Sequence, residues 1–310
     1  MTKSSGTPFR GRDIISTRDF AKDELHYLLD LAESFREGGA PRLEGKLMAA
    51  LFFEPSTRTR LSFESAMLRL GGASLGFADS GVSSTAKGES LADTVRVVEG
   101  YADVIVMRHP REGAARAAAE AVEIPVINAG DGANQHPTQT LIDLYTIRRT
   151  KGRLERLKIG FLGDLKFGRA VRSLVNTLED FDCDMTFISP PSLRLPGYFL
   201  EELTEAGVRW SETAEIFPAC ESLDVLYVTR IQRERFPDPL EFERVKNTYQ
   251  LDEPFLERAA PDIAILHPLP RVNEISPALD AYPQAVYFQQ AHNGVTVRQA
   301  ILAAVLGGER

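Results

Sequence analysis

The stretch Phe52-Phe53-Glu54-Pro55-Ser56-Thr57-Arg58-Thr59-Arg60 places three hydroxyl groups and two guanidinium groups between two patterned segments. Residues 47–53 form an apolar run typical of a buried strand, and residues 57–70 carry apolar and charged side chains at helical spacing. A helix is therefore predicted to begin where the hydroxyl groups lie. Backbone N–H groups at a helix start, together with the positive end of the helix dipole, attract an oxyanion.

The side chains of this stretch are suited to binding a phosphate group. Ser56 is predicted to be the N-cap residue, and Thr57 and Thr59 can donate hydroxyl hydrogen bonds. Arg58 can bind two phosphate oxygens at once through its planar fork. An ordinary capped helix with solvated arginines is the alternative interpretation. The doubled Ser-Thr-Arg-Thr-Arg pattern directly after a strand favours the phosphate site.

Length and composition limit the class of protein. A chain of 310 residues is long enough for two domains of about 150 residues each. With 36 Lys and Arg against 44 Asp and Glu, the net charge of −8 argues against a nucleic-acid surface, so an anionic ligand needs a local cluster of cations. Cys183 and Cys220 lie in apolar sequence without CxxC spacing, which favours reduced thiols in the cytosol.

Neither export nor membrane insertion is indicated. The first twelve residues are polar, and no run approaches the roughly 18 apolar residues that a transmembrane helix needs. A cytoplasmic location is therefore expected.

Apolar runs alternate with helical patterns nearly throughout, which predicts an α/β fold with parallel sheets covered by helices. Strands are predicted at residues 47–53, 73–78, 103–107 and 125–128, and then at 158–162, 185–188, 208–210, 225–228 and 263–266. A first helix is expected at residues 17–36. The basic polar segment 148–153 places a domain boundary near residue 150. We therefore expect two doubly wound parallel-sheet domains, residues 1–150 and 151–294, linked by interdomain helices, with a final helix in residues 295–310 packing back on the first domain.

Ligands of such sheets bind beyond the carboxyl ends of the strands, and the polar loops that follow the predicted strands are rich in hydrogen-bond donors. The candidate groups there are Arg108, His136, Gln139, Arg169, Arg230, Gln232 and the segment His267-Pro268-Leu269-Pro270-Arg271. His136 precedes Pro137 at a predicted helix start, where the dipole favours a neutral imidazole that donates a hydrogen bond. A helix-capping histidine and solvated surface arginines are the alternative interpretations.

Several catalytic classes lack their motifs in this sequence. There is no GxSxG elbow, no cysteine near a histidine, no HExxH motif, no GxGxxG fingerprint and no GxxxxGK[ST] loop. Neither a metal ion nor another cofactor is expected. What remains is a site that binds a phosphorylated small molecule and a second anionic substrate, and that works by positioning and electrostatic stabilisation.

Five segments together closely resemble the catalytic chain of the aspartate transcarbamoylase (aspartate carbamoyltransferase) family, and the resemblance runs over essentially the whole chain. They are residues 52–60, 106–110, 130–139, 163–169 and 267–271. The resemblance implies transfer of the carbamoyl group of carbamoyl phosphate to the amine of L-aspartate. The products are N-carbamoyl-L-aspartate and phosphate, in de novo pyrimidine (UMP) biosynthesis.

By the same resemblance, residues 1–150 bind carbamoyl phosphate and residues 151–294 bind aspartate. The phosphate contacts are implied to be Ser56, Thr57, Arg58 and Thr59, and the carbonyl oxygen is implied to be polarised by Thr59, Arg108 and His136. Gln139 and the main-chain carbonyls of Leu269 and Pro270 would hold the carbamoyl nitrogen. Arg169, Arg230 and Gln232 would bind the aspartate carboxylates.

Members of this family complete each site with a loop from the next subunit. Ser83 and Lys87 in residues 83–89 match that loop, with Lys87 contacting aspartate as well, which implies a homotrimer with shared sites. Taken alone, this Gly- and Ser-containing segment is typical of an ordinary surface loop. Regulatory chains or a dihydroorotase partner, and with them allosteric control, are left open by the sequence.

Two residues differ from the family pattern, and two alternative functions have to be weighed. Phe167 stands where tyrosine is common in the family, and Asn273 replaces a frequent acidic residue, so the details of domain closure and allosteric behaviour are open. Ornithine transcarbamoylase shares the Ser-Thr-Arg-Thr-Arg stretch but typically carries a cysteine in its last motif, as His-Cys-Leu-Pro. This chain has Leu269 within His267-Pro268-Leu269-Pro270, and its Arg230-Ile231-Gln232 loop suits a carboxylate. The other rival is a non-catalytic phosphate-binding scaffold, which is disfavoured because every matched group is present.

Overall fold

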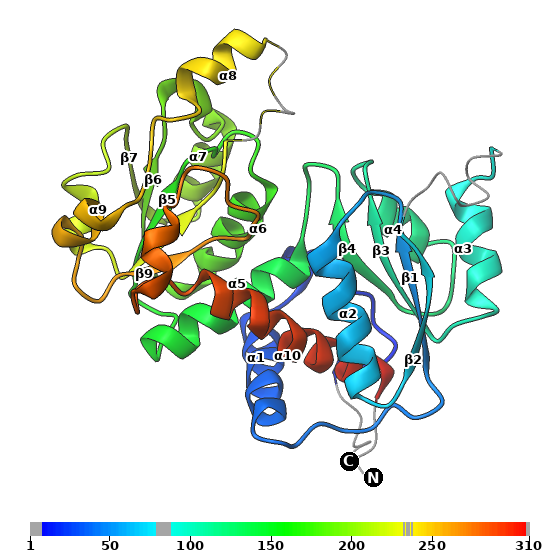
Figure 1. Ribbon diagram of the computed structural model, residues 1–310. Coiled ribbons are helices and arrows are strands. Elements are labelled where there is room, and N and C mark those ends of the chain that lie inside the picture. Colours follow the sequence, from blue (N-terminus) through cyan, green and yellow to red (C-terminus); the bar gives the residue numbers. More distant parts are fainter. Residues whose placement is uncertain (1–7, 79–87, 232, 234–235, 237, 308–310) are drawn as a thin grey trace. The chain divides into compact units, whose positions relative to one another are not determined.

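The computed structural model describes residues 8–78, 88–231, 233, 236 and 238–307 (Figure 1). The chain divides into two compact units. The first contains Met1–Ile142 and His292–Arg310, and the second contains Asp143–Ala291. Each unit is built around one parallel sheet, so the predicted α/β class with two parallel sheets is confirmed.

The sheet of the first unit has the strand order β2-β1-β3-β4, with all neighbours parallel. Its strands are β1 (Leu47–Phe52), β2 (Ala73–Phe77), β3 (Val104–His109) and β4 (Val126–Asp131). Three of them are almost continuously buried, as expected for strands covered on both faces, whereas the edge strand β2 is largely exposed. The register places Phe52 opposite Arg108, at the carboxyl ends of β1 and β3.

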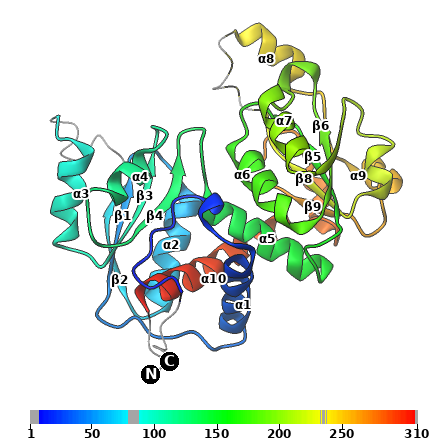
Figure 2. The ribbon, with the colours of Figure 1, turned by 180° about the vertical axis from the view of Figure 1, so that it is seen from behind.

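Helices cover both faces of this sheet. Figures 1 and 2 show α2 (Thr57–Arg69) and α10 (Tyr287–Leu306) on one face, and α3 (Leu91–Glu99) and α4 (Ala114–Ala119) on the other. The guanidinium of Arg298 in α10 lies 4.9 Å from the ring centroid of Phe63 in α2. Leu51 and Ile105 pack with Val95 of α3 in a common apolar cluster. These contacts hold the carboxyl edge of the sheet, where α2 begins.

The N-terminal segment differs in detail from the single helix expected at residues 17–36. A short 3₁₀ turn, Thr17–Asp19, is capped by the hydroxyl of Ser16, and α1 (Lys22–Arg36) begins only after it. The break is stabilised because the Glu24 carboxylate accepts the backbone N–H of Ala21 at 2.9 Å. Before the turn, Ile14 pairs with Ile127 and extends the sheet beyond β4.

The sheet of the second unit has the order β7-β6-β5-β8-β9, again all parallel. Its strands are β5 (Lys158–Leu162), β6 (Asp184–Ile188), β7 (Arg209–Thr213), β8 (Val225–Val228) and β9 (Ala264–Leu266). The helices of this unit include α6 (Arg169–Leu178), α7 (Gly197–Glu205), α8 (Pro239–Val245) and α9 (Glu253–Arg258).

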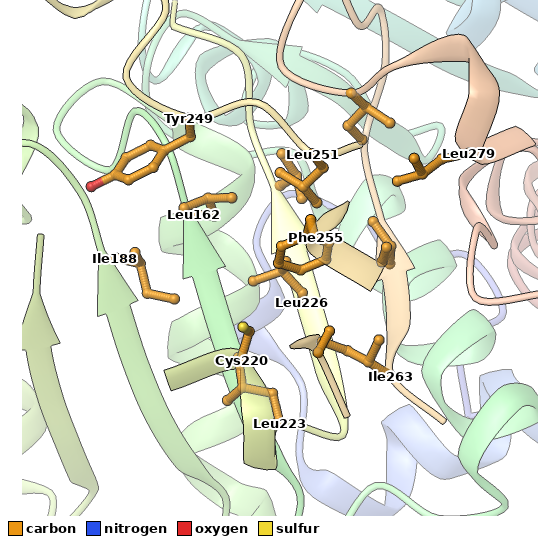
Figure 3. Packing of buried hydrophobic residues seen from close by; sticks show 14 of the residues in the cluster. Leu162, Ile188, Cys220, Leu223, Leu226, Tyr249, Leu251, Phe255, Ile263 and Leu279 are labelled. Carbon is orange, nitrogen blue, oxygen red and sulfur yellow. The ribbon is translucent and has the colours of Figure 1, made fainter. Parts of the chain in front are cut away.

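Figure 3 shows the apolar cluster on which this second sheet rests, with Leu162 and Ile188 next to Leu226, Leu251 and Phe255. Cys220 lies within it, and burial raises the pKa of the Cys220 thiol to about 11. Burial likewise raises the pKa of Cys183 to about 11. Both thiols are therefore protonated at neutral pH, which is consistent with core packing.

Two helices belong in part to each unit. α5 (Pro137–Lys151) continues as one helix through residue 150, near the expected domain boundary, and the compact units divide after Ile142. The basic segment that indicated a linker contains the last turn of α5, where cations interact favourably with the helix dipole. α10 begins at Tyr287, eight residues before the predicted start at Val295. The prediction started too late because buried polar residues such as Gln290 interrupt the apolar pattern of the helix.

Candidate active site

The start of α2 has the local geometry of an anion site. Ser56 occupies the N-cap position as predicted, with an extended backbone, and its carbonyl accepts the N–H of Arg60 at 3.2 Å. Its hydroxyl makes no capping hydrogen bond, so it is not committed to the helix. The N–H groups of Thr57, Arg58 and Thr59 precede this first intrahelical bond. The Thr59 side chain is buried, whereas Thr57 and Arg58 are exposed.

Arg108 stands at the carboxyl end of β3, next to the strand that leads into α2. Its Nε donates to Glu54 Oε2 at 3.0 Å, and only 13% of its side chain is exposed. Burial lowers the pKa of Arg108, the Glu54 carboxylate opposes that effect, and the net direction is downward. An arginine nevertheless stays charged in proteins. Glu54 therefore fixes a largely buried cation at this edge of the sheet.

The loop after β4 is organised by the buried carboxylate of Asp131. Oδ1 accepts Asn128 Nδ2 at 2.9 Å and the Gln135 N–H at 3.0 Å. Oδ2 accepts the Gly113 N–H at 2.8 Å and Asn134 Nδ2 at 3.0 Å. These four bonds fix the turn that leads directly into His136.

His136 lies at the start of α5, as predicted. Its carbonyl accepts the N–H groups of Gln139 and Thr140 at 2.9 and 3.2 Å, and its side chain is buried. The ring Nδ1 lies 3.5 Å from Thr138 Oγ1. The positive end of the helix dipole disfavours a positive charge here, so a neutral imidazole is expected. Gln139 follows in the first turn of the same helix.

The second unit places two arginines after neighbouring strands of its sheet. Arg169 is the first residue of α6, in the loop region after β5, and Arg230 follows β8. The two loops pack closely because Gly163 has φ +114°, and a Cβ there would lie 2.2 Å from the carbonyl oxygen of Thr229. The hydroxyl of Thr229 also accepts the N–H of Asp164 at 3.1 Å. Both arginines are half-buried.

A small hollow lies at the ends of β5 and β8. Its lining includes Gly163, Thr229, Lys246 and Glu274. The segment after β9 carries Leu269, whose peptide bond to Pro270 is cis, and Leu269 is half-buried while Pro270 is exposed. The carboxyl edge of this sheet therefore carries all the described groups predicted for the second unit.

Three of the predicted site residues, Ser83, Lys87 and Gln232, lie outside the described residues. Among the described residues, no group of His, Cys, Asp and Glu side chains is arranged to hold a metal ion. The helices described contain none that is long and apolar enough to cross a membrane.

Residues that order the site were missed by sequence reasoning. Glu54 pairs with Arg108 across 54 positions, and Asp131 binds Gly113 across 18, so no local pattern reveals either contact. Glu54 lies in the stretch that carries the hydroxyl groups, and Asp131 lies between two glycines. An acidic residue inside a donor-rich loop is the only signal that would have indicated them.

Comparison with known protein families gives two matches that together cover most of the chain. The model described as the carbamoyl-P binding domain of aspartate/ornithine carbamoyltransferase matches residues 12–149, and the Asp/Orn binding domain model matches residues 155–305. The chain belongs to the aspartate/ornithine carbamoyltransferase family. The resemblance identified from the sequence motifs is thereby confirmed.

Within this carbamoyltransferase family, similar curated relatives are aspartate carbamoyltransferase catalytic subunits. That of Thermococcus onnurineus is 56% identical over 304 residues, covering 96% of this chain and 98% of the relative. That of Methanopyrus kandleri is 58% identical over 305 residues, covering 97% and 99%.

Solved structures of the same carbamoyltransferase family share the fold. The catalytic subunit of M. jannaschii aspartate transcarbamoylase has a TM-score of 0.89 and 51% identity, covering 95% of this chain and 98% of that chain. The Trypanosoma cruzi aspartate transcarbamoylase, in complex with carbamoyl aspartate and phosphate, has a TM-score of 0.91 and 38% identity, covering 99% and 100%.

Proposed function

We propose that this chain is an aspartate carbamoyltransferase catalytic chain. It transfers the carbamoyl group of carbamoyl phosphate to the amine of L-aspartate, giving N-carbamoyl-L-aspartate and phosphate. The observation that carries the proposal is the similarity, over 96% of this chain, to catalytic subunits of that activity. The groups that the reaction needs lie at the carboxyl edges of the two sheets, which is additional support.

In the first unit, the start of α2 binds the phosphate through Ser56, Thr57, Arg58 and Thr59. Arg108 and His136, with the Thr59 hydroxyl, donate to the carbonyl oxygen, which becomes an oxyanion when the amine attacks. Each such donor contributes on the order of 3 kcal/mol to transition-state stabilisation. Glu54 and Asp131 act indirectly, by holding Arg108 and the turn before His136.

In the second unit, Arg169, Arg230 and Gln232 bind the aspartate carboxylates. The carbonyls of Leu269 and Pro270, together with the Gln139 side chain of the first unit, hold the carbamoyl nitrogen. The unprotonated amine of aspartate forms a bond to the carbamoyl carbon. The bond from that carbon to the phosphate oxygen then breaks, and the amine proton leaves with the phosphate. No covalent enzyme intermediate is needed because carbamoyl phosphate is already activated.

The proposed assembly is a homotrimer, cytoplasmic and acting in pyrimidine synthesis, in which Ser83 and Lys87 of a neighbouring subunit complete each site. Leu61 and Leu68 are 57% and 62% exposed and lie seven residues apart on α2, so they share a helix face. A subunit contact would remove that apolar surface from water. Regulatory chains or a dihydroorotase are further candidate partners, since the name "catalytic subunit" of the relatives implies other subunits in those proteins.

Product formation from carbamoyl phosphate by the purified chain, with L-aspartate and L-ornithine in parallel, tests this function. Activity with aspartate alone is expected, because Arg230 suits a carboxylate and Pro268 stands where the ornithine enzymes typically carry cysteine. Activity with ornithine alone would overturn the substrate assignment. Inactivity with both amines would instead favour a phosphate-binding scaffold.

A further inference from the structure

A chain of buried polar side chains in the second unit has no role in the reaction described above. It connects β8, α5, α10 and the segment after β9, and its members are 0 to 6% exposed. They are Tyr227, Asp143, Gln290, His267 and Glu274. Buried polar groups are costly unless they are hydrogen-bonded, and here the bonds converge on the loop that carries Leu269.

The protonation state of His267 follows from its partners. The backbone N–H of Leu269 donates to Nδ1 at 2.8 Å, and a backbone N–H can only donate, so Nδ1 carries a lone pair. The ring is therefore neutral, and Nε2 carries the proton that it donates to Glu274 Oε1 at 2.8 Å. Contact with a carboxylate would otherwise suggest an ion pair, but a protonated Nδ1 cannot accept the Leu269 bond.

Glu274 fixes the other side of the loop. Its carboxylate also accepts the N–H of Val272 at 3.1 Å and that of Asn273 at 3.1 Å. Burial raises the pKa of Glu274, but the hydrogen bonds from His267 and the backbone lower it by more, so the group is ionised at neutral pH. Its main chain is anchored because the N–H of Leu251 donates to the Glu274 carbonyl at 2.9 Å, and Leu251 lies in the apolar cluster of Figure 3.

Gln290 and Asp143 fix the backbone of His267 through two successive hydrogen bonds. The N–H of His267 donates to Gln290 Oε1 at 2.8 Å, so the amide NH₂ points the other way and donates to Asp143 Oδ1 at 2.7 Å. The Tyr227 hydroxyl donates to Asp143 Oδ2 at 2.8 Å. Burial, together with the nearby Asp143 carboxylate, raises the pKa of Tyr227 well above its usual range, so it remains a donor.

These contacts hold a backbone that would not keep its shape alone. Leu269 has φ +58°, in the left-handed region that is unfavourable for a residue with a Cβ. Its N–H bond to His267 compensates for part of that cost and limits rotation of the adjacent peptide planes. The carbonyl groups of Leu269 and Pro270 consequently have set directions before any ligand binds, which is the preorganisation that precise recognition requires.

We propose that His267 is a positioning residue that aims the Leu269 and Pro270 carbonyls at the substrate's amino group, and thereby selects a carbamoyl over an acetyl phosphate. The inference rests on the proposed function. Acetyl phosphate has a methyl group where carbamoyl phosphate has NH₂, so it cannot donate to these carbonyls. The preference for carbamoyl phosphate over acetyl phosphate therefore depends on the directions of the Leu269 and Pro270 carbonyls.

Two substitutions at one position separate the contacts of His267. In His267→Asn the amide oxygen stands as far along the side chain as Nδ1, so it retains the acceptor for Leu269. In His267→Gln the amide stands at the place of Nε2, which retains the contact to Glu274 and removes the acceptor. The readout is the ratio of the inhibition constant of acetyl phosphate to the KM of carbamoyl phosphate, with thermal unfolding recorded for each variant.

We expect His267→Gln to lower this ratio about tenfold, the effect of one lost polar contact, and His267→Asn to keep it within about threefold of wild type. Equal ratios in all three proteins, or a larger loss in His267→Asn, would overturn the proposal. If His267→Gln does not fold, Glu274→Gln replaces it, with an expected decrease of about threefold. An unchanged ratio in that variant would also overturn it. Tyr282→Phe, which removes the exposed contact to Glu253, is the matched control.

The wild-type protein separates this inference from the function on which it rests. A chain that does not carbamoylate aspartate would refute both. A chain that carbamoylates aspartate while His267→Gln keeps the wild-type ratio would refute only the role of His267.

Discussion

Two arginines in the stretch after β1 lie two positions apart and have different surroundings. Nε of Arg60 donates to Glu64 at 2.7 Å, an i,i+4 ion pair along α2. Arg58 lies in the first turn, among the N–H groups that precede the first intrahelical bond, and its side chain is exposed. The same residue type thus supports the helix at one position and faces the proposed phosphate site at the other.

We expect Arg58→Ala to lower kcat at least about a hundredfold without unfolding the protein, because the developing charge on the departing phosphate loses its bidentate partner. Arg60→Ala is the matched control and should stay within about threefold, since a single i,i+4 ion pair along a helix contributes little. Steady-state kinetics and circular dichroism of both variants measure the effect. A near-normal rate in Arg58→Ala would refute the assigned role.

At the scale of elements, the loop between β4 and α5 depends on a single carboxylate. Asp131 accepts two hydrogen bonds on each oxygen and joins the β4 end, the turn before His136 and the start of α4. An amide in its place has only one accepting oxygen, so two donors would face an NH₂ group.

We expect Asp131→Asn to lower the free energy of unfolding by about 2–4 kcal/mol, the cost of two unsatisfied donors, and kcat by at least about tenfold as His136 shifts. Asp93→Asn, at an exposed carboxylate that accepts the Ser90 hydroxyl at 2.7 Å, is the control and should change neither. Denaturant unfolding and kinetics at neutral pH measure both quantities. Lost stability with an unchanged kcat would mean that the loop does not position His136.

The sequence predicted the elements better than their ends. Alternating apolar runs indicated every strand of the two sheets, because burial on both faces requires them. The prediction for β4 stopped at Asn128, whereas the strand reaches Asp131, since these polar side chains are buried and hydrogen-bonded to each other. A polar side chain indicates a solvent-exposed position only when it has no hydrogen-bond partner within the protein. The local sequence pattern does not reveal such a partner.

The same limit applies to the site. Arg108, His136 and Arg230 were predicted from their places after strands, because topology brings the carboxyl ends of parallel strands to one edge. Contacts between residues far apart in the sequence were not predicted. The hydrogen bond from Gln290 to Asp143, for example, joins positions 147 residues apart. Sequence reasoning therefore reached the groups proposed to touch substrate and missed buried residues such as Gln290 and Asp143, whose partners lie far away in the sequence.

For the whole molecule, composition and site chemistry have to be reconciled. The chain carries a net charge of −8, yet its proposed substrates are anions. Four arginines nevertheless lie near the carboxyl edges of the two sheets, Arg58 and Arg108 in one unit and Arg169 and Arg230 in the other. Local placement of this kind binds anions without a broad basic surface, which would also attract nucleic acid.

A homotrimer with shared sites makes one prediction that concerns the assembly alone. Lys87→Ala and Arg58→Ala chains should each be nearly inactive, because every site in either homotrimer lacks one group. In mixed trimers, a site is intact when Lys87 comes from an Arg58→Ala subunit and Arg58 from a Lys87→Ala subunit. Random reassembly of equal amounts meets both conditions in about one quarter of sites, so about a quarter of wild-type activity is expected.

The measurement is the aspartate carbamoylation rate after the two chains are dissociated, mixed and reassembled, with each variant treated alone as the control. Sites contained within one subunit would always lack Arg58 or Lys87, whatever the mixture, and no activity would return. Recovery near one quarter therefore requires that the two groups reach one site from different subunits. Absence of recovery in trimers shown to be mixed would exclude the shared site and leave Lys87 to act within its own chain.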